Sequence, residues 1–245
     1  MNEARGSSQG IPKRNQVRAE GRSEDAIRGS AGPGAQEQLQ SPSGFLEGYL
    51  NHVAENCDNL DEPQSLFRYA KASGQVISKA EITALRRYEL TGGVEHEVFL
   101  PPGDGEAWHI IKATRPPSER WKGHGYGLNP DAVSYLTRLA KMNLLAPGLD
   151  YRILGVTPTL APDCAWPSFV TRMAYISGTE PTADELHAYM TKLGFRDCGL
   201  NVWEHASALT LGDVHTGNFI KTPDGRMAPI DVTVEGDVLL PEVMF

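Results

Sequence analysis

Residues 1–42 contain no aromatic residue and are rich in Gly, Ser, Gln, Arg and Ala. Such a segment cannot bury enough apolar surface to offset the roughly 1–2 kcal/mol of backbone entropy that each ordered residue costs. We therefore expect these residues to form a disordered tail or an inter-domain linker. Any fold must be built by residues 43–245 of the 245-residue chain, a length that suits one or two domains.

The composition excludes several classes of protein. Hydrophobic residues make up 40% and charged residues 22%, so most of the chain can form a core. The sequence has no run of about 18 apolar residues and no apolar segment near the N-terminus, so we expect neither a membrane span nor export. Three cysteines without a CxxC pair fit free thiols in a reducing cytoplasm. The net charge is −8, so the chain lacks the basic surface that nucleic-acid binding requires, and no nucleic-acid partner is expected.

Residues 43–90 are predicted to form a helical N-terminal extension, because their apolar residues recur at helical spacing. Its expected helices span 44–56, 64–73 and 79–88. The third begins at a capping box, in which Ser78 precedes Glu81 by three residues.

From residue 91 onward, short strand patterns separated by Pro, Gly, Asp and Asn indicate an α+β fold. The expected strands span 94–100, 107–114, 152–156, 168–174, 217–222 and 226–232. One helix is predicted to start with Asn129 as its N-cap and Pro130 at its first position. Another is predicted to open at Thr182 and to be closed by Gly194.

The segment 211–220 contains the candidate catalytic residues. Asp213 and Asn218 have the spacing of a kinase catalytic loop, and Asp231 ends an apolar strand reached through a hairpin. Carboxylate and amide oxygens are the hard ligands that Mg²⁺ prefers, so Asn218 and Asp231 are the candidate metal ligands. Asp213 can orient an acceptor hydroxyl and accept its proton, which makes Asp213 and Asn218 the candidate catalytic residues.

A kinase also needs a lysine on a strand to hold the nucleotide phosphates, and Lys112 lies late in an apolar strand. Gly92 and Gly93, with Glu95 after them, are candidates for a turn that covers those phosphates. The backbone near 171–174, which includes Arg172 and Met173, is expected to follow a strand and to hydrogen-bond the adenine. All six of these residues are therefore candidate cofactor-binding residues.

The segment 212–218, Gly-Asp-Val-His-Thr-Gly-Asn, followed by Ile230-Asp231, resembles the G-D-x-H-x-G-N…I-D pattern of aminoglycoside-phosphotransferase-like kinases. With the segments 92–99, 178–182 and 193–195, the chain more closely resembles the kinase-like domain of phage and mobile-element polyvalent proteins. The resemblance covers roughly residues 76–236.

This resemblance implies a compact two-lobed protein-kinase-like fold with a reduced C-terminal lobe. The N-lobe would span about 91–172 and the C-lobe about 173–245. It also implies ATP and Mg²⁺ as cofactors, a bacterial host cytosol, and a chain that is part of a larger multidomain protein. The implied activity is phosphoryl transfer from ATP to an acceptor that is a protein hydroxyl or a small-molecule alcohol.

Three departures from the kinase pattern favour a second interpretation. Val232 and Thr233 follow Asp231 where a kinase has Phe-Gly, and few residues remain to form a platform for a peptide substrate. No glutamate is an obvious ion-pair partner for Lys112. The acidic residues that could take this role are Asp131, Glu119 and Glu95. The chain could thus be an inactive pseudokinase that acts as a nucleotide-binding or protein-interaction module.

Each motif also has a purely structural interpretation. Asp and Asn favour turns, so Asp213, Asn218 and Asp231 could simply shape a hairpin. Lys112 could be a surface lysine that lies along a strand. A metal site made of His205, Asp213 and His215 is not expected, because their spacing matches no closed zinc site.

Overall fold

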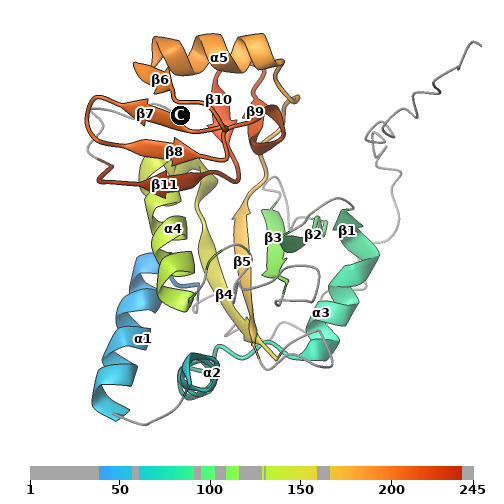
Figure 1. Ribbon diagram of the computed structural model, residues 1–245. Helices are drawn as coiled ribbons and strands as arrows, with labels where there is room; N and C mark the ends of the chain where they lie inside the picture. The colour runs from blue at the N-terminus through green and yellow to red at the C-terminus, as the bar shows by residue number, and fades with distance from the viewer. Residues whose placement is uncertain are drawn as a thin grey trace, which may run out of the picture. The chain divides into compact units, whose positions relative to one another are not determined.

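The computed structural model describes residues 39–56, 61–90, 95–102, 109–115, 129, 131–158 and 166–238 (Figure 1). The tail expected over 1–42 lies almost wholly outside these residues. The helices are α1 (Pro42–Asn56), α2 (Glu62–Ala72), α3 (Lys79–Leu85), α4 (Ala132–Leu145) and α5 (Ala183–Lys192). Single 3-10 turns cover Arg86–Tyr88, Pro147–Leu149 and Thr216–Asn218.

A five-stranded antiparallel sheet has the strand order β1-β2-β3-β5-β4. Its strands are β1 (Glu89–Leu90), β2 (His96–Phe99), β3 (His109–Thr114), β4 (Arg152–Thr157) and β5 (Ser168–Ala174). Except for the two-residue β1, each strand lies where the sequence predicted one. Helix α4 lies between β3 and β4 in the chain, so it follows the strand that carries Lys112.

The C-terminal part of the described chain holds two smaller antiparallel sheets. The first has the order β11-β8-β7-β6, and the second is the hairpin of β9 and β10. These strands are β6 (Phe195–Asp197), β7 (Trp203–His205), β8 (Thr210–Gly212), β9 (Phe219–Lys221), β10 (Met227–Pro229) and β11 (Thr233–Glu235). The sequence predicted β9 and β10 but missed the four-stranded sheet, because strands of three residues are too short to show alternation. The chain therefore has the expected α+β class.

Local capping signals were reliable at two helices and misplaced at one. The predicted capping box of Ser78 with Glu81 forms, and the helix predicted to open at Thr182 begins there with a capping box between Thr182 and Glu185. Helix α4, however, is capped by Asp131 and not by Asn129. The Asp131 carboxylate accepts hydrogen bonds from the Ser134 backbone N–H and hydroxyl, so the helix begins two residues later than expected.

A hydrophobic core joins helices α1 and α2 to all three sheets. Phe45 of α1 is fully buried, and its ring meets the edges of Tyr69 and Phe169 at centroid distances of 5.0 and 5.8 Å. Helices α1 and α4 lie side by side, as Figure 1 shows, and α4 also contacts β11 of the four-stranded sheet. Two helices of the predicted N-terminal extension, α1 and α2, are thus packed into this core, whereas Ile82 of α3 belongs to a smaller cluster with Phe99, Ala113 and Val170.

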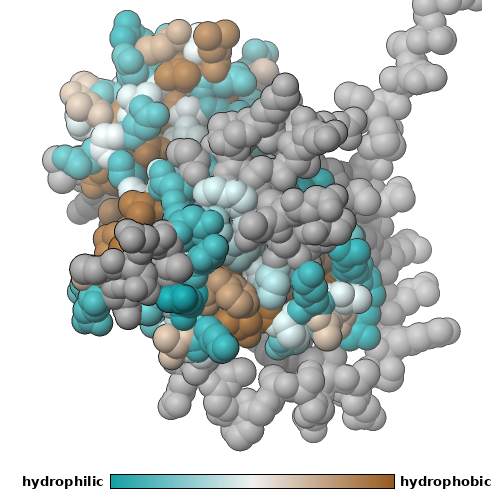
Figure 2. Space-filling view, turned by 60° about the horizontal axis from the view of Figure 1, so that its bottom comes forward, coloured by the Kyte–Doolittle hydropathy of each residue, from teal (hydrophilic) through white to brown (hydrophobic). Residues whose placement is uncertain are grey.

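The surface of the described residues exposes a few large hydrophobic side chains. Leu200, at the turn between β6 and β7, is 97% exposed, and Leu144 of α4 is 66% exposed. On the face in Figure 2, hydrophobic residues lie in separate groups between hydrophilic ones. Within the described ranges, none of the helices has the length and apolar character that crossing a bilayer requires.

Candidate active site

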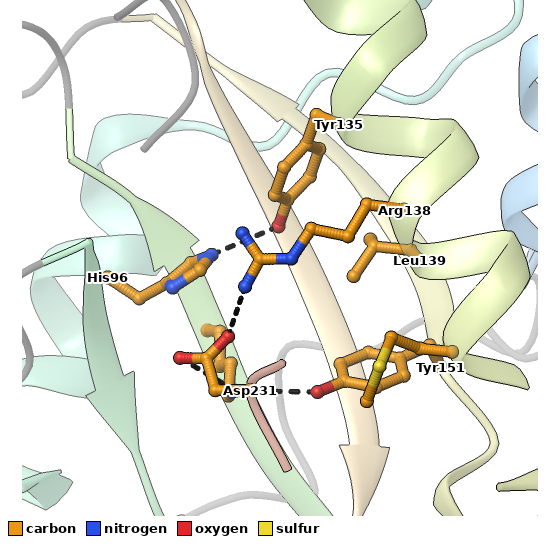
Figure 3. A pocket seen from close by; sticks show the side chains of 8 residues that line it. His96, Tyr135, Arg138, Leu139, Tyr151 and Asp231 are labelled. Atoms are coloured by element: carbon orange, nitrogen blue, oxygen red, sulfur yellow. Dashed lines mark hydrogen bonds and ion pairs between the residues drawn. The ribbon is translucent and has the colours of Figure 1, made fainter. Parts of the chain in front are cut away.

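The carboxylate of Asp231 lies between two cationic side chains from distant parts of the chain (Figure 3). Its Oδ1 accepts a hydrogen bond of 2.6 Å from the guanidinium of Arg138, and its Oδ2 lies 3.9 Å from the Lys112 ammonium. Partial burial alone would raise the pKa of the Asp231 carboxyl, but Lys112 and Arg138 hold it at about 2. Asp231 is therefore ionised at any ordinary pH.

Lys112 lies on β3, and other groups of the protein hold its ammonium in place. Its ammonium donates a 3.2 Å hydrogen bond to the Ile230 carbonyl and lies 3.5 Å from the Tyr151 hydroxyl. The Tyr151 hydroxyl itself donates to the same carbonyl at 2.7 Å. Burial would lower the pKa of Lys112, but the adjacent Asp231 carboxylate outweighs that effect and raises it. Lys112 is thus a charged, buried lysine, and its acidic partner is Asp231 rather than Asp131 or Glu95.

The residue that sequence reasoning missed is Arg138. It projects from α4, donates 2.8 Å and 2.6 Å hydrogen bonds to Glu95 and Asp231, and contacts the Val232 carbonyl through Nε at 3.3 Å. Its side chain is only 9% exposed. A signal was present, because Arg138 falls at helical spacing among the apolar residues Tyr135, Leu139 and Met142. A charge on the apolar face of a helix needs a buried partner.

Glu95, which directly precedes β2, holds the guanidinium of Arg138 in place. Its Oε1 accepts from Arg138 and also from the Asn129 side-chain amide at 3.3 Å. The Glu95 side chain is itself only 9% exposed. Its geometry makes it a partner of Arg138, whereas the sequence suggested a contact with nucleotide.

His96 closes the buried side of this cluster. Its Nε2 lies 3.2 Å from the Tyr135 hydroxyl, and its Nδ1 lies 4.0 Å from Glu95 Oε2. Burial lowers the pKa of His96 to about 4, even though the Glu95 and Asp231 carboxylates favour the charged form. At neutral pH the imidazole is therefore uncharged, and the two carboxylates are balanced by Arg138 and Lys112.

The candidate catalytic residues Asp213 and Asn218 form a second, more exposed group. Asn218 donates hydrogen bonds from Nδ2 to the backbone carbonyl and the Oδ2 of Asp213, at 2.9 and 2.8 Å. Asp213 has a left-handed backbone with φ of 58°, a conformation that Asp tolerates better than most residues. His215 Nδ1 accepts from the Gly217 N–H at 3.2 Å, so in the neutral ring its Nε2 carries the proton and faces Asp213 Oδ1 at 3.5 Å.

Backbone contacts place the ends of the segment 212–218 beside the residues that flank Asp231. The Ile230 N–H donates to the Asn218 carbonyl at 2.8 Å, and Gly212 pairs with Thr233 across β8 and β11. A Cβ at Gly212 would lie 2.3 Å from the Thr233 hydroxyl, so only glycine allows this close pairing. The residues before Asp213 and on both sides of Asp231 are therefore fixed next to one another.

Other predicted site residues lie apart from this cluster or outside the described residues. Gly92 and Gly93 are in the latter group. Arg172 and Met173 lie within β5, which spans the predicted 168–174, so they do not follow a strand as the adenine-binding backbone was expected to do. Arg172 pairs with strands on both sides, Ile111 of β3 and Arg152 of β4, so its backbone is part of the sheet. A backbone segment that is free to hydrogen-bond adenine can therefore begin no earlier than residue 175.

The donor atoms near the cluster suit a hard divalent cation. Asn218 uses its amide nitrogen in both hydrogen bonds, so its Oδ1 oxygen is available as a metal ligand. The side chain of Asp231 is 31% exposed, so its carboxylate can also be reached by a metal ion. Mg²⁺ prefers oxygen ligands of these two kinds. The space between Lys112, Arg138, Tyr151 and Asp231 is about 10 Å³, which is room for one water molecule and too small for a nucleotide. Among these four side chains, Asp231 is partly exposed to solvent.

Comparisons of this chain with family models, with curated proteins and with solved structures give no match. The functional conclusion therefore depends on the sequence motifs and on the geometry described above.

Proposed function

We propose that the chain is an ATP- and Mg²⁺-dependent phosphotransferase with a two-lobed protein-kinase-like fold, which transfers phosphate to an alcohol group. The observation that carries the proposal is the meeting of Lys112 and Asp231. They belong to separate sheet regions, yet their charged groups lie 3.9 Å apart, with Asp231 accessible from solvent. Phosphoryl transfer depends on such a lysine and such an aspartate at one place.

The arrangement of the five-stranded sheet supports the same proposal. The lysine lies on the third strand, and a helix follows that strand before the chain returns to the sheet. In protein kinases the phosphate-binding lysine is on the third strand, and a helix supplies its ion-pair network. Here α4 supplies Arg138 in place of a glutamate, and Asp231 takes the role of the lysine's acidic partner.

Each residue then has a role that its surroundings permit. Lys112, held by Ile230 and Tyr151, binds the phosphate oxygens of the nucleotide. Asp231 and Asn218 would hold Mg²⁺, which neutralises charge on the phosphates when it is bound. Asp213 is about half exposed, so it can accept a hydrogen bond from the acceptor hydroxyl and then its proton. Asn218 keeps Asp213 oriented for that contact.

Titration calorimetry with Mg·ATP tests the proposal. We expect wild-type protein to bind, and Asp231→Ala and Lys112→Met to lose about tenfold or more in affinity, because each removes a charged contact to the ligand. The matched control is Asp184→Ala, which removes an exposed carboxylate from the first turn of α5. Equal binding by wild type and Asp231→Ala would remove the proposal.

A specific observation favours a second candidate, a pseudokinase that binds nucleotide without transferring phosphate. Asp231 already has two cationic partners, and Arg138 occupies one of its oxygens directly. Single-turnover assays with γ-labelled ATP against small alcohols and host lysate separate the two candidates. Transfer that is lost in Asp213→Ala supports the enzyme, whereas nucleotide binding without any transfer supports the pseudokinase.

A further inference from the structure

The guanidinium of Arg138 lies between the carboxylates of Glu95 and Asp231, where a metal ion would meet both of them. Ligand atoms of Glu95, His96 and Asp231 all lie within 4.8 Å of one another, a separation that one divalent cation could bridge. Arg138 donates to two of these three residues, at 2.8 and 2.6 Å. Its third contact, from Nε to the Val232 carbonyl, fixes the direction from which the guanidinium enters.

The charges of this cluster are already balanced. Glu95 and Asp231 contribute two negative charges, Arg138 and Lys112 contribute two positive charges, and His96 is buried. A free divalent cation that approached Asp231 would meet two cations at close range, and it would have to displace a buried, hydrogen-bonded guanidinium. Repulsion between like charges a few ångströms apart is strong at the effective dielectric constant of a protein.

We infer that Arg138 takes the place of a metal ion in this cluster and so excludes free divalent cations, which leaves Asp231 open only to a metal that arrives with an anionic polyphosphate. The second half of this inference rests on the proposed function, whereas the exclusion of free metal does not. The phosphates of a nucleotide would bring negative charge that offsets the charge of the incoming metal, and Lys112 is positioned to bind them. Arg138 is thus a specificity-determining residue for the charge of the ligand.

The test uses Mn²⁺, because carboxylates bind it and it can be followed by electron paramagnetic resonance. We expect wild-type protein to bind no Mn²⁺ at this cluster when nucleotide is absent. The variant Arg138→Gln is expected to gain about a hundredfold or more in affinity for Mn²⁺ alone, because a full positive charge beside the cation is removed. Its melting temperature should then rise with Mn²⁺ concentration, since a ligand of the folded state stabilises it.

Two further variants keep the result interpretable. Arg196→Gln is the matched control, because Arg196 pairs with Glu204 on the exposed face of β6 and β7, and it should gain no Mn²⁺ site. Arg138→Gln leaves the buried Glu95 and the partly buried Asp231 less well paired and could fail to fold. The double variant Arg138→Met/Glu95→Gln removes one charge of each sign, and it should still bind Mn²⁺ more tightly than wild type.

The outcomes separate this inference from the proposed function. Binding of Mn²⁺ alone by wild type, at a site that Asp231→Ala removes, overturns the inference whatever ATP does. The absence of any gain in a folded Arg138 variant also overturns it. A gain in that variant, with no binding of Mn·ATP by wild type, supports the role of Arg138 in excluding free metal and contradicts the proposed function.

Discussion

The buried His96 should make the stability of this protein strongly dependent on pH between about 4 and 6.5. The imidazole is 4% exposed, and its pKa falls from 6.5 to about 4. In this interval the unfolded chain binds a proton at His96 that the folded chain does not. Because stability rises with pH wherever the unfolded state binds more protons, lowering the pH destabilises the fold.

The size of the effect follows from the two pKa values. A shift of one unit corresponds to about 1.4 kcal/mol, so the fold should lose about 1 kcal/mol between pH 7 and pH 5.5 and about 3 kcal/mol by pH 4. The groups that face the ring are the Tyr135 hydroxyl, the carboxylates of Glu95 and Asp231, and the cations Lys112 and Arg138. Asp231 does not titrate in this interval, because its pKa is about 2.

Urea denaturation at pH 7, 5.5 and 4 measures the effect, with His96→Gln as the variant. Glutamine can still hydrogen-bond Tyr135 but does not titrate, so the difference in unfolding free energy between pH 7 and pH 4 should shrink by about 3 kcal/mol. His109→Gln is the matched control, since His109 is half-buried on β3 and its pKa is lowered less markedly. Parallel pH profiles for wild type and His96→Gln would refute the reasoning.

Three other substitutions probe the contacts that build the site, and urea denaturation measures each. Gly212→Ala should cost about 1–3 kcal/mol, because the new Cβ would meet the Thr233 hydroxyl at 2.3 Å. Phe45→Ala should cost about 3–5 kcal/mol in one cooperative transition, because Phe45 is fully buried in the shared core. Tyr151→Phe should cost about 1 kcal/mol, since its hydroxyl bonds the Ile230 carbonyl beside Lys112.

Each of these expectations has a result that contradicts it. A Gly212→Ala variant as stable as wild type would mean that β8 and β11 do not pair as closely as described. If Phe45→Ala unfolds α1 alone and leaves the main transition unchanged, the N-terminal helices are a separate unit. If Tyr151→Phe is neutral, Lys112 is held by its other contacts.

Sequence reasoning located the elements whose signals are local. The capping box at Ser78 forms as predicted, because it depends on residues three positions apart, and the helix predicted to open at Thr182 does begin there. The strand that carries Lys112 was also located, since a short apolar run is visible in sequence. The hydrogen bond between the side chains of Asp213 and Asn218 was not predicted.

Residues whose role depends on distant partners were assigned less well. Asn129 was expected to cap a helix, but it bonds Glu95, and Asp131 caps α4 instead. The sequence predicted the bounds of the strand over 168–174 correctly, but it also placed an adenine-binding backbone at Arg172 and Met173, whose backbone is paired within the sheet. The acidic partner of Lys112 was sought at Asp131, Glu119 and Glu95, whereas the fold supplies Asp231.

The sequence by itself determined the α+β class, most helices and longer strands, and several of the polar residues to which we assign a role in the proposed phosphoryl transfer. These properties follow from periodicity and spacing over a few residues. Only the tertiary structure decided that Arg138 joins Glu95 to Asp231 and that three-residue strands assemble into a second sheet. The physical reason is that the strength of a buried charge pair or a short strand depends on neighbours far away in the chain, which no local pattern specifies.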